Sequence, residues 1–381
     1  MTQLRIPAVY MRGGTSKGVF FHARDLPADP ALRDRLLLRV IGSPDPYGRQ
    51  IDGMGGATSS TSKVVLVAPS TRADCHVEYR FGQVAIDRPL IDWSGNCGNL
   101  TTAVAPFAIA EGLVAAPRDG MATVRLWQAG IGKVIVAHVP MAAGAVREEG
   151  TFALDGVTFP AAEVRLEFLD PGGGTMLSTG HAADTLDVPG VGRLDATLID
   201  AGNPTVFVAA AALGLAGTEH KRDVDGDAAL LARLEAVRAH AAVAMGLART
   251  PQEATATRLH TPKLAFVAAP RDYVAADGTP VPAARVDLVA RIMSMGALHH
   301  AMTGTGAVAL AAAAAIPGTV VHGLLPATHD AARTVFGHPS GTLAVGAAVE
   351  RRDGAWRVAK VVQSRSARRL MEGWVRVPAD A

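Results

Sequence analysis

Two apolar helices constrain the fold of this chain more than any other sequence feature. Residues 307–316 contain only Ala, Val, Leu and Ile, and residues 100–110 are polar only at two threonines. A helix that is apolar all round presents no face to water, so it must be buried on every side. Its small alanine side chains allow strands to approach it closely.

Both helices follow a turn of glycine and polar residues. The first is entered through Asn96–Asn99 and the second through Thr303–Gly306. Positions 97 and 303 are 206 residues apart, about half of the 381-residue chain. We interpret this spacing as an internal pseudo-repeat, with one buried helix in each half. The length also exceeds that of one typical core, so two domains are expected.

Short runs rich in valine and isoleucine predict strands, and they outnumber the predicted helices. The predicted strands are residues 64–67, 77–81, 134–136, 164–168, 205–208 and 264–267. The predicted helices are residues 31–41, 100–111, 229–245, 286–295 and 307–316. Residues 229–245 keep their larger apolar side chains on one face, which is typical of an outer helix. The glycine-rich segment 170–174 is expected in the region that links the halves.

The charge balance excludes several classes of partner. Lys and Arg number 37 against 35 Asp and Glu, so there is no general field to attract nucleic acid or an anionic membrane surface. No apolar run reaches the roughly 20 residues needed to cross a bilayer, and the first residues lack the apolar segment of a signal peptide. We expect a cytoplasmic protein with a small-molecule partner. The alanine-rich apolar surfaces are compatible with a homo-oligomer.

The chain has two cysteines, Cys75 and Cys97, and both are expected to be free thiols. Cys97 stands just before a predicted helix, where unpaired N–H groups and a partial positive charge stabilise a thiolate and hold an anion. The alternative is a small apolar residue buried at a tight turn. The glycine and asparagine neighbours of Cys97 favour the reactive role.

Two glycine-rich loops concentrate hydrogen-bond donors. Residues 12–18 are suited to gripping a carboxylate or phosphate, although their spacing is not that of a P-loop; a surface turn is the alternative. Residues 52–62 lead to Lys63 at the start of a predicted strand. That lysine is either solvated or presented into a cleft, where desolvation lowers its pKa and makes it a usable base. No histidine or cysteine spacing typical of a metal site occurs, so no metal is expected.

Taken together, five segments resemble the PrpF family, the 2-methylaconitate isomerases, essentially from end to end. These segments are residues 12–21, 52–56, 94–99, 338–341 and 365–373. The resemblance implies an α/β (α+β) fold like that of diaminopimelate epimerase, with two pseudo-symmetric domains that each curl a mixed sheet around a central apolar helix. The expected domains are residues 1–184, with Lys63 and Cys97, and residues 185–381, with the Thr303–Gly306 turn. An alternative is that the last strand returns to the first domain.

The resemblance also implies which residues form the site. Lys63 and Cys97 are the functional pair that it carries over. Residues expected to contact the substrate are Thr15, Ser16, Asn96, Gly98, Asn99, Asn203, Thr303, Gly304, Thr305 and Ser340. Where the epimerases have a second cysteine this chain has Thr303, so racemisation by two thiols is not available.

The implied reaction is the isomerisation of 2-methyl-trans-aconitate to 2-methyl-cis-aconitate by allylic proton transfer, without a cofactor, in propionate breakdown through the methylcitrate cycle. Lys63 is the expected base, and Cys97 is the opposing acid or an orienting group. An alternative is a 4-oxalomesaconate Δ-isomerase or tautomerase of aromatic-acid catabolism. A second is an NAD(P)-dependent oxidoreductase, for which Gly304 and Gly306 give a weak dinucleotide pattern. A third is a carboxylate-binding protein without catalysis.

Overall fold

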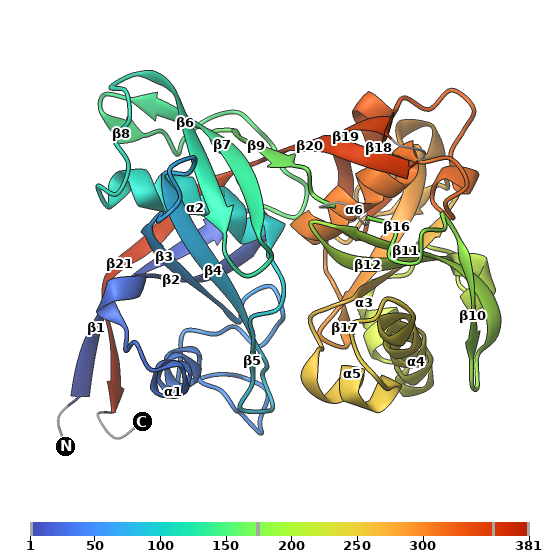
Figure 1. The fold of residues 1–381 in the computed structure, drawn as a ribbon, viewed down its shortest axis with the longest axis horizontal. Helices are drawn as coiled ribbons and strands as arrows, with labels where there is room; N and C mark the ends of the chain where they lie inside the picture. The colour runs from blue at the N-terminus through green and yellow to red at the C-terminus, as the bar shows by residue number, and fades with distance from the viewer. Residues whose placement is uncertain (1–2, 173–175, 353–354, 379–381) are drawn as a thin grey trace. The chain divides into compact units, whose positions relative to one another are not determined.

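The computed structural model describes residues 3–172, 176–352 and 355–378, and the chain divides into two compact units (Figure 1). Unit 1 comprises Met1–Leu166 and Arg365–Ala381, and unit 2 comprises Glu167–Ser364. From the sequence we expect one domain boundary, between residues 184 and 185. In the structure the chain passes from unit 1 to unit 2 after Leu166 and returns to unit 1 after Ser364. The last strand returns to unit 1. Residues 170–172 of the predicted linker belong to unit 2, and its residues 173 and 174 lie outside the described ranges.

Unit 1 combines a mixed sheet with two α-helices. Its strands are β1 (Gln3–Gly13), β2 (Ser16–His22), β3 (Lys63–Pro69), β4 (Val77–Val84), β5 (Ile91–Asp92), β6 (Gly120–Gln128), β7 (Lys133–Ala142), β8 (Ala145–Val146) and β21 (Ala367–Pro378), and β9 (Val164–Leu169) crosses into unit 2. Its helices are α1 (Pro30–Ile41) and α2 (Gly98–Ala110), besides the 3-10 turn η1 (Ala23–Asp25).

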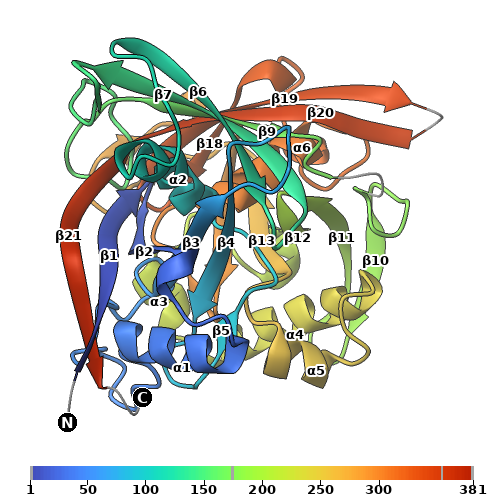
Figure 2. The same ribbon diagram turned by 60° about the vertical axis from the view of Figure 1, so that its left-hand side comes forward.

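The sheet of unit 1 runs in the order β21–β1–β2–β3–β4–β6–β7, with β2–β3 and β4–β6 parallel and the other neighbours antiparallel. Figure 2 shows β21, β1, β2, β3 and β4 side by side in this order. Alternate side chains of a strand face opposite sides of the sheet. Val19 and Phe21 accordingly pack in one cluster with α1, while the ring centroid of Phe20 lies 5.6 Å from that of Phe107 in α2. The two helices therefore cover opposite faces.

Unit 2 repeats this plan. Its strands are β10 (Asp184–Val188), β11 (Gly192–Ala201), β12 (Asn203–Ala209), β13 (Lys263–Ala268), β14 (Tyr273–Val274), β15 (Pro280–Val281), β16 (Leu288–Ser294), β17 (Ala297–Leu298), β18 (Thr334–His338), β19 (Gly341–Arg352) and β20 (Ala355–Arg365, whose last residue is counted in unit 1). Its α-helices are α3 (Lys221–Asp225), α4 (Ala228–Ala244), α5 (Pro251–Thr257) and α6 (Gly304–Ala315). Four 3-10 turns are η2 (Ala210–Leu213), η3 (Ala283–Arg285), η4 (His322–Leu324) and η5 (Ala331–Arg333).

The strand directions confirm the internal repeat. The sequence β11–β12–β13–β16–β18–β19 has the same alternation as β1–β2–β3–β4–β6–β7, with parallel pairs only at β12–β13 and β16–β18. Helix α2 lies between β4 and β6 in the chain, and α6 lies between β16 and β18. Cys97 caps α2 and Thr303 caps α6. The two turns that lead into the apolar helices are thus at equivalent positions of one repeated fold.

One predicted helix, residues 286–295, is wrong. Leu288–Ser294 instead form β16, which pairs with β13 on one side and with β18 on the other. Every residue of this strand is buried, and a strand buried on both faces lacks the apolar–polar alternation that would separate it from a buried helix. The other predicted helices and all the predicted strands are found in place.

Candidate functional site

The candidate site in unit 1 begins at the N-terminus of α2. Cys97 is the N-cap residue, its Sγ accepts a hydrogen bond from Leu100 N at 3.5 Å, and its exposed fraction is 8%. The first turn of α2 contains no acidic side chain, so nothing on the helix itself offsets the partial positive charge at this end. The arrangement favours an anion beside the Cys97 thiol.

The turn between β1 and β2 packs directly on this helix end. A Cβ atom added to Gly13 would lie 2.5 Å from Asn99 O, and Gly14 has a φ of +49°, a conformation that favours glycine. The close approach lets Asn99 Nδ2 donate a hydrogen bond to Thr15 Oγ1 at 3.0 Å. Glycines at 13 and 14 therefore bring Thr15 and the buried Ser16 to the start of α2.

Lys63 is the first residue of β3, and it is buried with an exposed fraction of 4%. Its Nζ donates a hydrogen bond to Gln83 Oε1 at 2.5 Å and lies 5.0 Å from the ring centroid of Phe81. The amide nitrogen of Gln83 donates to Ser59 O and Ser62 O at 3.2 and 3.1 Å. Because those two carbonyls only accept, Gln83 must turn its oxygen toward Lys63.

Burial lowers the pKa of Lys63 below its ordinary value of 10.5, and a negative charge on Cys97 would act in the opposite direction. Cys97 is therefore close enough to act on the charge of Lys63, although 34 positions separate them in the chain. The solvated alternative for Lys63 is excluded by its burial. Unit 1 thus brings together Lys63, Cys97 and the Thr15–Ser16 turn.

Gly18 allows β2 to approach Lys63, which leads to a testable prediction. A Cβ atom there would lie 2.8 Å from Lys63 O and 2.9 Å from Leu100 Cδ1. Gly18→Ala should lower the free energy of unfolding by about 1–3 kcal/mol, measured by urea denaturation, because backbone and core atoms must shift. The control is Gly323→Ala, where an added Cβ meets nothing within 4 Å. Equal stability of the two variants would contradict this account of Gly18.

Asn96, another expected substrate contact, forms hydrogen bonds with side chains of the protein itself. Its side chain is fully buried, its Oδ1 accepts from the Tyr79 hydroxyl at 3.1 Å, and its Nδ2 donates to Thr101 Oγ1 at 3.2 Å. Burial raises the pKa of Tyr79, which keeps that hydroxyl protonated as a donor. These bonds fix the loop that carries Cys97.

Arg365 is a site residue that the sequence did not single out, apart from its place in one family-like segment. The side chain has an exposed fraction of 1%, and burial lowers its pKa to about 10, whereas a negative charge on Cys97 would raise it. The guanidinium is therefore still a cation at neutral pH. The burial of this arginine could not be predicted from the sequence, since arginine side chains are usually exposed.

Unit 2 holds the remaining expected contacts around the start of α6. Thr303 Oγ1 accepts from Gly306 N at 3.1 Å, and Ser340 Oγ donates to His300 O at 2.6 Å. The turn before Asn203 packs on the same helix end, because a Cβ atom added to Gly202 would lie 3.1 Å from Val308 Cγ1. Thr305 is buried within α6. This turn joins β11 to β12 and corresponds, by its place in the repeat, to the β1–β2 turn of unit 1.

Lys263 is a second buried lysine that the sequence analysis missed. It is the first residue of β13, as Lys63 is of β3, and its Nζ donates to His260 O at 3.3 Å and Ser294 Oγ at 3.4 Å. The His260 ring in turn contacts Asn203 Nδ2 at 3.3 Å. The signal that could have revealed Lys263 is the repeat itself, which sets it 200 positions after Lys63.

Neither a metal cluster nor a membrane helix is found within the ranges that the structure describes. No three His, Cys, Asp or Glu side chains of residues 3–172, 176–352 and 355–378 gather so as to hold a metal ion. Over the same residues, no helix is long and apolar enough to cross a membrane.

Comparison with known proteins places the chain in a family. The family described as PrpF protein matches residues 3–378. Proteins named 2-methyl-aconitate isomerase from Shewanella oneidensis and Cupriavidus necator are each 57% identical to it, over 99% and 100% of this chain and 98% of each relative. A crystal structure of methylitaconate-delta-isomerase is 41% identical, covers 99% of this chain and 96% of that chain, and superposes with a TM-score of 0.77. The predicted fold, α/β of the diaminopimelate epimerase type, is confirmed. The chain belongs to the PrpF family.

Proposed function

We propose that this protein is an isomerase that converts 2-methyl-trans-aconitate to 2-methyl-cis-aconitate, as a step of propionate breakdown through the methylcitrate cycle. The observation that carries the proposal is the pair in unit 1, in which the buried Lys63 is held by Gln83 and Cys97 caps the N-terminus of α2. The name shared by two relatives at 57% identity supports the choice of substrate.

The proposed mechanism is an allylic proton transfer. Lys63, as a neutral amine, takes a proton from a carbon next to the C=C bond, and the electron pair spreads through that bond into a carboxylate. The former double bond then rotates, and a proton returns to the same carbon, so no atom is gained or lost and no cofactor is needed. Cys97 is the opposing acid or orients the substrate. The N–H groups of Gly98 and Asn99 stabilise the developing charge.

The other expected contacts remain part of this proposal. Hydroxyl, amide and backbone N–H groups would bind the carboxylates of the substrate. The residues concerned are Thr15, Ser16, Asn203, Thr303, Gly304, Thr305 and Ser340, with Asn96 acting through the loop of Cys97.

The substrate is tested by supplying 2-methyl-trans-aconitate and 4-oxalomesaconate to the purified protein in parallel assays. We expect a higher kcat/KM for 2-methyl-trans-aconitate. A preference for 4-oxalomesaconate would instead assign the protein to the alternative isomerase activity. An increase in Tm with NAD(P) would revive the oxidoreductase alternative.

The lowered pKa of Lys63 predicts the pH dependence of the reaction. Only the neutral amine accepts a proton, so kcat/KM should rise with pH and level off at a pH below 10.5, the ordinary pKa of lysine. The check is a pH–rate profile for the wild type and for the residual activity of Lys63→Ala. The rising limb should be missing from the variant, and an identical limb in both proteins would exclude Lys63 as its source.

A further inference from the structure

We propose that Arg365 binds a carboxylate of the substrate next to Cys97, through the edge of its guanidinium formed by Nε and Nη2. The inference rests on the proposed function for the nature of the anion, a group of a tricarboxylic acid. Among the described residues, neither Nε nor Nη2 of Arg365 has a hydrogen-bond partner, although the exposed fraction of this residue is only 1%. Buried donors of a cation are rarely left without an acceptor.

A second buried arginine shows how the fold holds such a group when its role is structural. Arg291 of unit 2 donates from Nε to Glu219 O at 2.6 Å and from Nη1 to Ala290 O at 3.0 Å, and its guanidinium carbon lies 5.2 Å from the ring centroid of Tyr273. Only its Nη2 has no partner among the described residues. Arg291 is thus held through its Nε, whereas the Nε of Arg365 has no hydrogen-bond acceptor among the described residues.

The two unpartnered nitrogens of Arg365 are the ones that a carboxylate needs. Nε–H and one N–H of Nη2 point in parallel from one edge of the guanidinium, and this edge matches the two oxygens of a carboxylate. The group is a cation, because its pKa remains at about 10. A planar anion with two oxygens therefore fits this edge better than a neutral ligand or a single hydroxyl group.

The backbone next to Arg365 is bonded to the β1–β2 turn, which packs on the start of α2. The neighbouring Ser366 accepts through its carbonyl oxygen from Gly14 N and from Arg12 Nη1, both at 2.9 Å. These bonds hold the segment against the β1–β2 turn, which itself packs on Asn99. The hydroxyls of Ser16 and Ser366 are also buried without partners among the described residues. Two segments, at Ser16 and at Arg365–Ser366, thus bring buried polar groups without described partners to the β1–β2 turn that packs on the start of α2.

The test measures the binding of propane-1,2,3-tricarboxylate, which has no C=C bond and so cannot be isomerised. Isothermal titration should show an affinity at least about 30-fold lower for Arg365→Gln than for the wild type, since a buried charge partner of the anion is removed. Arg365→Lys should lose less, because it keeps the charge without the paired geometry. The matched control is Arg368→Gln, which changes an exposed arginine three residues away and should bind like the wild type.

Equal affinity of folded Arg365→Gln and wild type would overturn the inference. If that variant does not fold, a crystal structure of the wild type with propane-1,2,3-tricarboxylate decides: a carboxylate on Nε and Nη2 supports the inference, and carboxylates bound elsewhere contradict it. These readouts do not depend on turnover. The proposed function fails separately, if the wild type binds the tricarboxylate but does not convert 2-methyl-trans-aconitate.

Discussion

Lys63→Ala should lower kcat/KM for 2-methyl-trans-aconitate by a factor of about 10³, within the range expected when a general base is removed. The buried amine is the group in unit 1 that is poised to take a proton, because burial lowers its pKa and Gln83 fixes its position. An alanine side chain has no group that could accept the proton. Steady-state kinetics at saturating and low substrate separate the loss in kcat from any change in KM.

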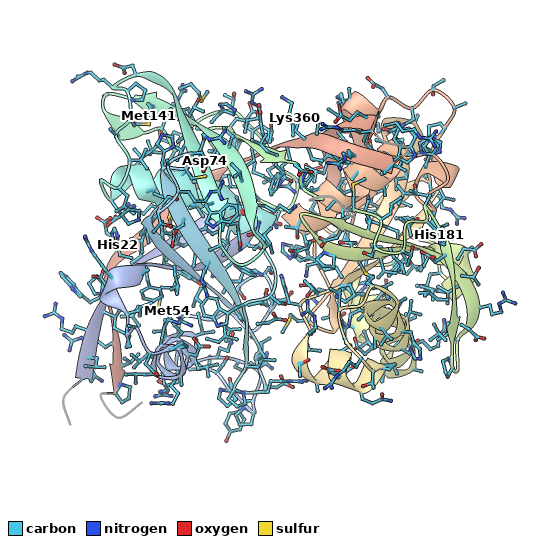
Figure 3. The ribbon with its side chains drawn as sticks, in the orientation of Figure 1. His22, Met54, Asp74, Met141, His181 and Lys360 are labelled. Atoms are coloured by element: carbon cyan, nitrogen blue, oxygen red, sulfur yellow. The ribbon has the colours of Figure 1, made fainter. Side chains whose placement is uncertain are left out.

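The control for this variant is Lys360→Ala. Figure 3 labels Lys360, an exposed residue of unit 2 whose Nζ lies 3.5 Å from Glu167 Oε2. A surface ion pair of this kind contributes little to stability, so the control should retain wild-type activity. Retention of full activity by a folded Lys63→Ala protein would remove Lys63 from the mechanism.

Cys97→Ser should lower kcat by about 10²–10³ with the fold intact. Serine preserves the N-cap of α2, since its oxygen also accepts from the N–H groups of the first turn. What it loses is the proton-donating ability of a thiol, because a serine hydroxyl is a far weaker acid. Thermal unfolding should therefore be nearly unchanged while turnover falls.

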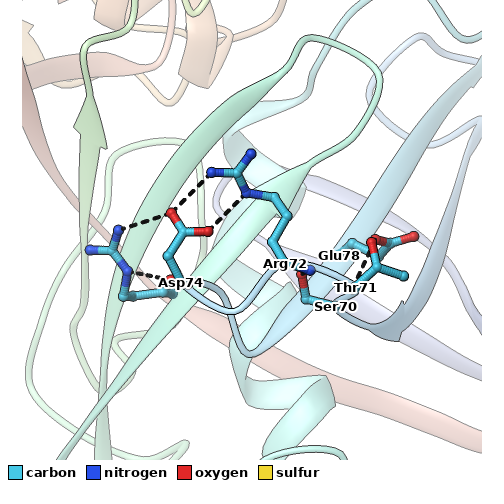
Figure 4. Close-up of polar contacts among 6 residues, drawn as sticks. Ser70, Thr71, Arg72, Asp74 and Glu78 are labelled. Atoms are coloured by element: carbon cyan, nitrogen blue, oxygen red, sulfur yellow. Dashed lines mark hydrogen bonds and ion pairs between the residues drawn. The ribbon is translucent and has the colours of Figure 1, made fainter.

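The matched control is the other cysteine. Cys75 lies in the connection between β3 and β4, next to Asp74. Asp74 forms an ion pair with Arg72, in which the Nε–Oδ1 distance is 2.9 Å and the Nη2–Oδ2 distance is 3.1 Å (Figure 4). Burial raises the pKa of the Cys75 thiol, which makes it a poor nucleophile. Cys75→Ser should keep wild-type kcat, and a loss equal to that of Cys97→Ser would show that both variants act through folding.

The fold could be predicted from the sequence where the composition of a segment is compatible with only one structural environment. Helices α2 and α6 carry no charge and follow glycine turns, so both their burial and their equivalence were evident. The error at β16 has the opposite cause: every residue of Leu288–Ser294 is buried, so its sequence does not alternate between apolar and polar residues, and only its pairing with β13 and β18 distinguishes it from a helix.

The site was predictable only where a residue type implied chemistry. Cys97 and Lys63 stood out by their neighbours and by the family resemblance. Arg365 did not, because its burial depends on β21 returning to pair with β1, a contact between residues more than 350 positions apart. Gln83 and Lys263 were missed for a related reason, since their roles arise from the strand register and from the repeat.

We propose above that the protein isomerises 2-methylaconitate by moving a proton at an allylic carbon. The most direct measurement follows 2-methyl-trans-aconitate by NMR in deuterated water, together with the rate for substrate deuterated at its methyl and methylene groups. We expect the cis isomer to form, with deuterium entering one of these carbons or with slower turnover of the deuterated substrate. Formation of the cis isomer with no incorporation and no isotope effect would contradict the mechanism.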